Sequence, residues 1–128
     1  MMMKLNRRTL AAALACATLL PAAWAQKPIV LGFSQVGAES EWRTANTESI
    51  KSAAKEAGIE LKFSDAQQKQ ENQIKAIRSF IAQKVDVIAF SPVVESGWEP
   101  VLREAKAAKI PVVLTDRSVN VKDPSLYV

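Results

Sequence analysis

Four short apolar runs recur along the chain at similar intervals, and helical patterns fill the stretches between them. The runs cover residues 29–33, 59–63, 85–90 and 110–114. A strand and a helix that alternate about every 25 to 30 residues are typical of βαβ units. Such units form a parallel sheet with right-handed crossovers. The sequence therefore predicts an α/β fold, with a parallel sheet and helices on both faces.

The composition of the runs predicts the order of the strands. The third run is apolar at almost every position, which is typical of a central strand buried on both faces. In the second run Glu60 and Lys62 alternate with apolar residues, which indicates an edge strand. The strand order 2-1-3-4 places the third strand in the centre of the sheet and the second strand at an edge. Residues 126–128 are predicted to begin a fifth strand, so the chain looks truncated, with the outer edge of the fourth strand unpaired.

The first 25 residues have the pattern of a secretory signal peptide. Lys4, Arg7 and Arg8 precede an uncharged apolar stretch that is too short to span a bilayer. Residues 23–25, Ala-Trp-Ala, form a small-x-small cleavage site, so we expect a mature N-terminus at Gln26. Lipoprotein processing at Cys16 is the less favoured alternative, and the choice between the general and the twin-arginine export route stays open. Residues 26–128 are predicted to form one folded unit.

Charge and composition exclude several kinds of site. The signal holds three basic and no acidic residues, so its removal lowers the net charge from +4 to +1. A charge that small gives no reason to expect nucleic-acid or anionic-membrane binding. The chain has no histidine, and its one cysteine, Cys16, lies in the signal. We therefore expect no zinc or copper site, no histidine-dependent catalytic triad and no disulfide framework. Gly32 and Gly37 make no dinucleotide fingerprint, so no cofactor is expected.

Two polar segments follow the first and fourth predicted strands. In open parallel sheets, ligands bind beyond the carboxyl ends of the strands. In the order 2-1-3-4 these ends lie two strand spacings apart, roughly 10 Å. Trp42, Arg43, Asp116 and Arg117 could span that distance around one small molecule. An indole covers the C–H face of a sugar, and charged groups bond its hydroxyls strongly. The pattern favours a sugar site over a catalytic one; the alternative is two ordinary polar loops.

Longer motifs carry a resemblance to a known family. The motifs are Gly-Phe-Ser-Gln-Val-Gly (32–37), Gln-Gln-Lys-Gln-Glu-Asn-Gln-Ile-Lys-Ala-Ile (67–77), Ser-Pro-Val-Val (91–94), Gly-Trp-Glu-Pro-Val-Leu (97–102) and Asp-Arg (116–117). On these motifs the chain resembles the periplasmic sugar-binding proteins of ABC transporters, of the ribose/galactose type, and among them those that bind galactofuranose.

The resemblance implies two similar α/β lobes that close on a sugar without catalysing a reaction. Residues 26–128 would be the first of these lobes, because the chain is much shorter than members of the family. The implied partners are a monosaccharide and a membrane permease, the location is the periplasm, and the full-length form is expected to be a monomer. By match to the family's motifs, the sugar contacts in this lobe would be Glu39, Ser40, Glu41, Trp42, Arg43, Asp116 and Arg117. Trp42 would cover the sugar, both arginines would donate, and Asp116 would accept.

Three other functions stay open. The same lobe could present a sugar to a chemoreceptor or kinase instead of a permease. A repressor-type effector-binding core is disfavoured by the signal peptide and by the lack of a helix-turn-helix pattern. Glu39 and Glu41 could form a glycosidase pair, but two carboxylates on one short loop do not readily flank a bond from opposite sides.

Overall fold

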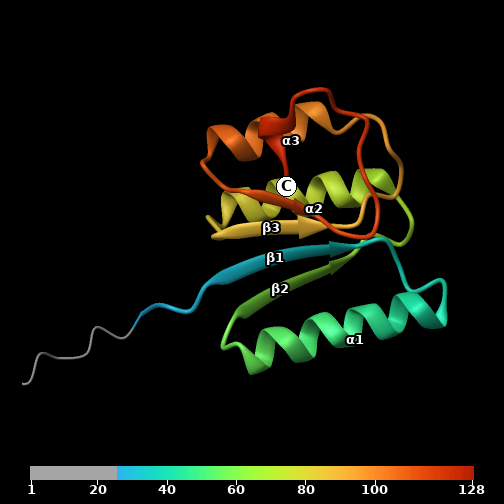
Figure 1. Ribbon diagram of the computed structural model, residues 1–128, viewed down its shortest axis with the longest axis vertical. Coiled ribbons are helices and arrows are strands. Elements are labelled where there is room, and N and C mark those ends of the chain that lie inside the picture. Colours follow the sequence, from blue (N-terminus) through green and yellow to red (C-terminus); the bar gives the residue numbers. More distant parts are fainter. Residues whose placement is uncertain (1–25) are drawn as a thin grey trace, which may run out of the picture.

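The computed structural model describes residues 26–128. The predicted signal peptide, with Cys16, lies outside the described residues. Strands and helices alternate along the described part (Figure 1). The elements are β1 (Val30–Gln35), α1 (Glu41–Glu56), β2 (Glu60–Asp65), α2 (Gln70–Ala82), β3 (Val87–Phe90), α3 (Glu99–Ala107), β4 (Val112–Leu114) and the 3₁₀ turn η1 (Pro124–Leu126).

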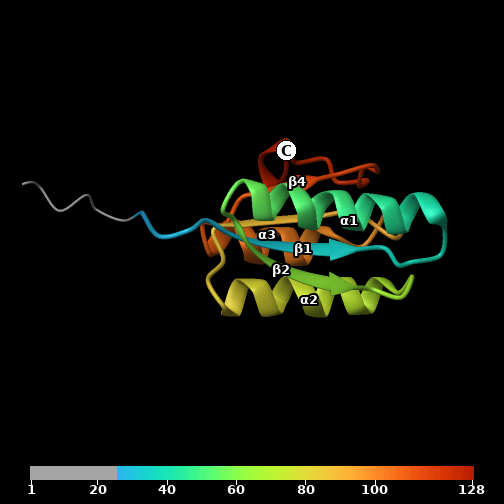
Figure 2. The same ribbon diagram turned by 90° about the horizontal axis from the view of Figure 1, so that it is seen from below.

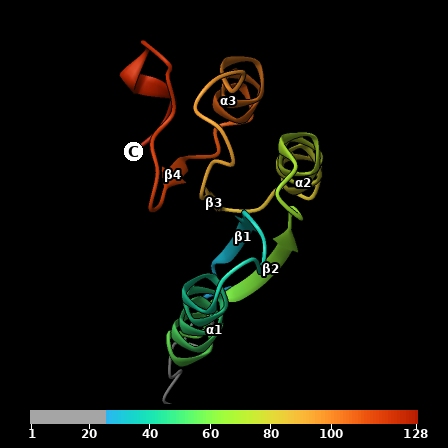
Figure 3. The ribbon, with the colours of Figure 1, turned by 90° about the vertical axis from the view of Figure 1, so that its right-hand side faces the viewer.

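The four strands form one parallel sheet in the order β2-β1-β3-β4. This confirms the predicted order, including the central place of β3 and the edge position of β2. All four strands run in the same direction, so their carboxyl ends meet at one edge of the sheet. Figure 3 looks toward that edge. From β1 the chain passes to β2 on one side of it, and from β2 it crosses to β3 on the other side. The sheet therefore has its topological switch point between β1 and β3, where a ligand is expected.

Helices cover both faces of the sheet, as predicted. Helix α1 lies alone on one face, and α2 and α3 lie on the other (Figures 1 to 3). On the α1 face Phe33 stacks on Phe63 with ring centroids 6.2 Å apart, and the Lys51 ammonium of α1 lies 4.9 Å from the Phe63 centroid. On the other face Gly32 meets Phe80 of α2. A Cβ at Gly32 would lie 2.5 Å from the Phe80 ring, so only glycine permits this close approach.

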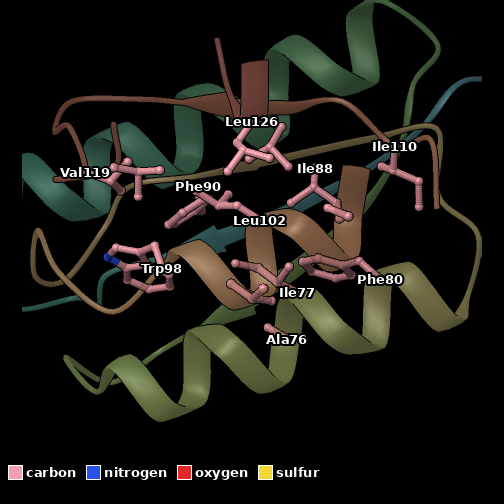
Figure 4. Packing of buried hydrophobic residues seen from close by; sticks show 14 of the residues in the cluster. Ala76, Ile77, Phe80, Ile88, Phe90, Trp98, Leu102, Ile110, Val119 and Leu126 are labelled. Atoms are coloured by element: carbon pink, nitrogen blue, oxygen red, sulfur yellow. The ribbon is translucent and has the colours of Figure 1, made fainter. Parts of the chain in front are cut away.

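The main hydrophobic core lies between the sheet and helices α2 and α3 (Figure 4). Trp98 is fully buried there and packs on Phe90 with ring centroids 4.8 Å apart. Its indole N–H donates to the Val94 carbonyl at 2.6 Å, so its polar group is satisfied. In the sequence Trp98 lies at helical spacing with Val101, Leu102 and Ala105, which predicts a core residue, and the structure confirms this. Val119 and Leu126, from the segment after β4, complete this core.

Helix α1 buries a narrower stripe than its sequence predicts. The pattern places Ile50, Ala53, Ala54 and Ala57 on the buried face, but only Ala54 is buried, while Ala53 and Ala57 are exposed. Among the described residues no other helix lies on this face (Figure 3), so α1 packs on the sheet alone along most of its length. Gly58 follows the end of this helix with a φ of +67°, a conformation that favours glycine.

The predicted fifth strand is not formed from residue 126. Pro124 starts a 3₁₀ turn instead, held by the Asp123 carboxylate, which accepts from the Ser125 N–H at 3.0 Å. Only Val128 pairs with β4: its N–H donates to Val112 O at 2.9 Å, and its carbonyl accepts from Leu114 N–H at 2.8 Å. The expectation of an unpaired outer edge on β4 is therefore wrong at this position. The two bonds follow the parallel pattern, so Val128 continues the direction of the sheet.

Candidate functional site

The loop after β1 leads directly into helix α1, and Ser40 caps that helix. Its φ and ψ of −148° and 158° are extended, and its Oγ accepts from the Arg43 N–H at 3.1 Å. Serine is favoured at this position because its oxygen satisfies an otherwise unpaired helix N–H. The predicted sugar contact Ser40 thus already has a structural role. Glu41, also predicted, lies exposed in the first turn and has no side-chain bond to the described residues.

Arg43 is the centre of the candidate site. Its side chain is only 4% exposed, although it carries a full positive charge. Its Nε donates to Glu39 Oε1 at 3.1 Å, and its Nη1 donates to Asp116 Oδ2, also at 3.1 Å. A buried guanidinium needs such partners because the unpaired ion would be strongly disfavoured. The structure therefore joins the two predicted loops, one after β1 and one after β4, through a single side chain.

Gln35, which the sequence analysis did not single out, is a third partner of the Arg43 side chain. It is fully buried at the end of β1. Its Oε1 accepts from Arg43 Nη1 at 3.3 Å and from the Val36 N–H at 3.0 Å. Its Nε2 donates to Asn46 Oδ1 at 2.9 Å and to Thr47 Oγ1 at 3.1 Å. All four hydrogen-bonding positions of the amide are used, so Gln35 fixes both α1 and the guanidinium. The sequence signal that could have indicated Gln35 is its place as a polar residue at the carboxyl end of a buried strand.

Trp42 lies beside Arg43 and is 55% exposed. The guanidinium carbon of Arg43 is 4.7 Å from the centroid of the indole ring, a cation–π contact. About half of the indole surface is therefore open to solvent, directly beside the buried guanidinium.

Asp116 and Arg117 follow β4 in an unusual turn. Asp116 has a φ of +65°, which aspartate and asparagine tolerate better than most residues. Arg117 is about half exposed; its Nη1 donates to Val93 O at 3.3 Å, and its Nε lies 3.8 Å from Asp116 Oδ2. A hollow of about 350 Å³ adjoins Arg117 and is lined by the segment after β3. Arg117 thus still has donors directed to solvent.

The electrostatics of the site keep Glu39 ionised. A hydrogen bond from its own backbone N–H lowers the pKa of the Glu39 carboxyl most; burial opposes this by raising the pKa, and the hydrogen bond and charge of Arg43 lower it further. A glycosidase acid needs the opposite, a raised pKa that keeps it protonated. The site holds two guanidinium groups and two bonded carboxylates, Glu39 and Asp116, so its formal charges balance. Such a site suits a neutral ligand with many hydroxyls.

Polar residues that follow β2 and β3 make no hydrogen bond to the Arg43 side chain. Ser91 is buried, and its hydroxyl lies 2.9 Å from that of Thr115, directly before Asp116. Residues 67–68 form an exposed loop at the same sheet edge. Among residues 26–128 there is no group of His, Cys, Asp or Glu side chains that could hold a metal ion. No helix in that part of the chain is long and apolar enough to cross a membrane.

Comparison with known proteins agrees with this arrangement. A family model described as "periplasmic binding protein domain" matches residues 31–128. The chain belongs to the periplasmic binding protein domain family. This places the network at the carboxyl edge of a known sheet architecture, and it confirms the family resemblance that the motifs indicated.

Relatives within the periplasmic binding protein family are close in sequence. The chain is 65% identical to the galactofuranose-binding protein YtfQ of Escherichia coli K12, over 78% of this chain and 31% of that protein. A solved arabinose-transporter component of Shewanella sp. ANA-3, bound to α- and β-L-arabinofuranose, is 66% identical, with a TM-score of 0.76 over 77% of this chain and 32% of that one. A Mycobacterium smegmatis protein in complex with β-D-fucofuranose is 69% identical, with a TM-score of 0.76 over 77% and 33%. The chain spans about a third of the length of these relatives.

Proposed function

We propose that this chain supplies one sugar-binding wall of a periplasmic solute-binding protein. The protein captures galactofuranose and delivers it to the membrane permease of an ABC transporter, without catalysing a reaction. Residues 26–128 form the N-terminal lobe, and a second lobe covers the other side of the sugar. The full-length form is a monomer.

One observation carries this proposal: the buried Arg43 is held by carboxylates from two loops and is covered by a half-exposed indole. Three relatives that are 65%, 66% and 69% identical to this chain over the aligned region are described with galactofuranose, arabinofuranose and fucofuranose. The common feature of these sugars is the five-membered ring. A site preorganised by so many internal bonds loses little freedom when it binds, which favours affinity for one ring shape.

Each side chain has a role that follows from its contacts. Trp42 covers the C–H face of the sugar with its free surface. Arg43 donates from Nη2, the guanidinium nitrogen for which no protein partner is described. Asp116 accepts from a sugar hydroxyl with the oxygen that Arg43 does not use, and Arg117 donates from the exposed end of its guanidinium. Glu39 acts on the sugar mainly through Arg43, and Ser40 holds the helix that carries both residues.

The ring form is tested with galactose labelled with carbon-13 at C1, because its furanose and pyranose forms give separate C1 signals. We expect a small amount of the full-length gene product, well below the amount of the furanose forms present, to broaden the furanose signals and to leave the pyranose signals sharp. Selection of a pyranose form contradicts the galactofuranose assignment, and so does binding of ribose alone. Absence of any sugar binding contradicts the proposed function itself.

Residue roles are tested by calorimetry with galactose on single variants. We expect Asp116→Ala and Arg117→Ala each to weaken binding about tenfold or more, because each removes a charged hydrogen-bonding partner. Lys69→Ala is the control: this residue is exposed at the start of α2 and has no side-chain cap bond there. An effect of Lys69→Ala as large as that of Arg117→Ala contradicts the assignment.

Export is part of the same proposal. We infer cleavage of the signal peptide before Gln26, on the residue pattern described above. N-terminal sequencing of the protein from a periplasmic fraction is expected to begin at Gln26. A retained Met1, or a lipid-modified Cys16, contradicts this.

A further inference from the structure

Two glutamines on the first turn of α2 hold the segment that follows β3. Gln73 is fully buried. Its Nε2 donates to Ser91 O at 2.7 Å, and its Oε1 accepts from the Val93 N–H at 2.9 Å. The Gln73 amide thus bonds one carbonyl and one N–H of this loop, as the backbone of a neighbouring strand would do. A buried amide with both partners in place fixes the loop in one conformation.

Gln70 holds the far end of the same segment. It lies three residues before Gln73 and hence on the same side of the helix. Its Nε2 donates to Ser96 O at 2.6 Å. Gly97 follows with a φ of +86°, and a Cβ at this position would lie 2.9 Å from the Gln70 amide nitrogen. The segment 91–96 is therefore clamped at both ends by side chains of one helix.

The clamped segment in turn supports the loop after β4, which carries part of the candidate sugar site. The Ser91 and Thr115 hydroxyls lie 2.9 Å apart, immediately before Asp116. The Val93 carbonyl accepts from Arg117 Nη1 at 3.3 Å. Further along, the Glu95 carbonyl accepts from the Asn120 N–H at 2.6 Å. Three separate bonds thus pass from one loop to the other, at its beginning, middle and end.

We propose that Gln73 is a positioning residue for the sugar site: it holds the segment 91–96, and this segment sets the place of Asp116 and Arg117. Gln73 does not touch the ligand, because it is buried beneath the loop. The effect of Gln73 on sugar binding rests on the proposed function. The structural coupling of α2 to residues 115–120 rests on the contacts alone.

The test compares Gln73→Met with Gln83→Met in the full-length gene product. Methionine has nearly the length and volume of glutamine but cannot hydrogen-bond through an amide. Gln83 lies at the other end of α2, is exposed and bonds only to Ser79 of the same helix among side chains. Two quantities are measured: the hydrogen-exchange rate of the Val93 and Asn120 amides, and the affinity for galactose.

We expect Gln73→Met to speed exchange at both amides and to weaken galactose binding about tenfold, as the loss of two buried bonds predicts. Gln83→Met should change neither. The proposal is overturned if the Asn120 amide and the affinity both stay within twofold of the wild type, because Gln73 would then stabilise only its own loop. Faster exchange with unchanged affinity also overturns it.

A second variant keeps the test decisive if Gln73→Met does not fold. Gln70→Ala removes only the outer, solvent-exposed bond, so the protein is expected to fold. It should change the same two quantities in the same direction, by a smaller factor; no change at Asn120 contradicts the proposal. If the wild type binds no galactose, the proposed function fails, and exchange at Asn120 still decides whether the clamp reaches the second loop.

Discussion

Replacement of Arg43 by lysine tests whether one guanidinium joins the two loops. Lysine keeps the positive charge but has a single nitrogen, which cannot reach Glu39, Asp116 and Gln35 together. The Arg43 side chain is 4% exposed, whereas the two carboxylate side chains are 27% and 32% exposed. A hydrogen bond to a buried charged group contributes about 1.5–3 kcal/mol. Solvent at the carboxylates screens these bonds, so we expect a loss of about 1–2 kcal/mol in the free energy of unfolding.

Urea denaturation of the full-length gene product measures this loss. Arg103→Lys is the matched control, because Arg103 bonds Glu99 at 2.7 Å on the exposed face of α3 with its side chain 56% exposed. An exposed pair four residues apart on a helix contributes only about 0.3–0.5 kcal/mol. The reasoning is refuted if Arg43→Lys destabilises the protein no more than Arg103→Lys does.

A double-mutant cycle then isolates the contact between the loops. Asp116→Asn removes the charge while it keeps a residue that tolerates the φ of +65° at this position. We expect the effects of Arg43→Lys and Asp116→Asn to be non-additive by at least about 0.5 kcal/mol, as is usual for residues in one network. Additive effects would mean that the 3.1 Å contact contributes nothing to the stability.

Two further predictions concern single sites. Gly32→Ala places a Cβ 2.5 Å from the Phe80 ring, so we expect a loss of about 1–3 kcal/mol in the free energy of unfolding, partly recovered by Phe80→Leu in the same chain; thermal unfolding checks both. Because the folded-state pKa of Glu39 is lowered from 4.5, its contribution to stability is present above that pH and is lost as the pH falls through the lowered value. The stability difference between wild type and Glu39→Gln, followed by urea denaturation from pH 6 to pH 3, should therefore shrink below pH 4.5; a difference that stays constant contradicts this.

The fold was predictable because each signal was strong and local. The contrast between the uniformly apolar β3 and the alternating β2 placed one strand at the centre and the other at an edge, and the observed order is the predicted one. Trp98 was assigned to the core from its helical spacing alone. The sequence also placed Arg43 and Asp116 near each other, since a sheet of this order brings the ends of β1 and β4 close together. It assigned both side chains to a ligand, however, and did not predict the hydrogen bond between them.

Gln35 and Gln73 could not be found in this way. A glutamine in a sequence is typical of an exposed surface, and each of these two becomes buried only because other parts of the fold supply its partners. Side chains of α1 do so for Gln35, and backbone groups of the segment after β3 do so for Gln73. The partners of Gln73 lie 18 and 20 residues away, on a loop whose path no periodicity records. Ser40 is the opposite case: a serine directly before a helix is a local capping signal, and the structure uses it as a cap.

The surface of Trp42 gives the most direct optical test of the proposed site. Trp42 and Trp98 are the tryptophans of the described residues, and only Trp42 is exposed. One side of its indole is engaged by the Arg43 guanidinium at 4.7 Å, which leaves the other side for a sugar. A sugar on that side displaces water, so we expect galactose to shift the emission of the wild type. Trp42→Phe should lose the shift and bind more weakly, whereas the buried Trp98 should report no change. An emission shift that persists in Trp42→Phe would mean that the sugar lies elsewhere.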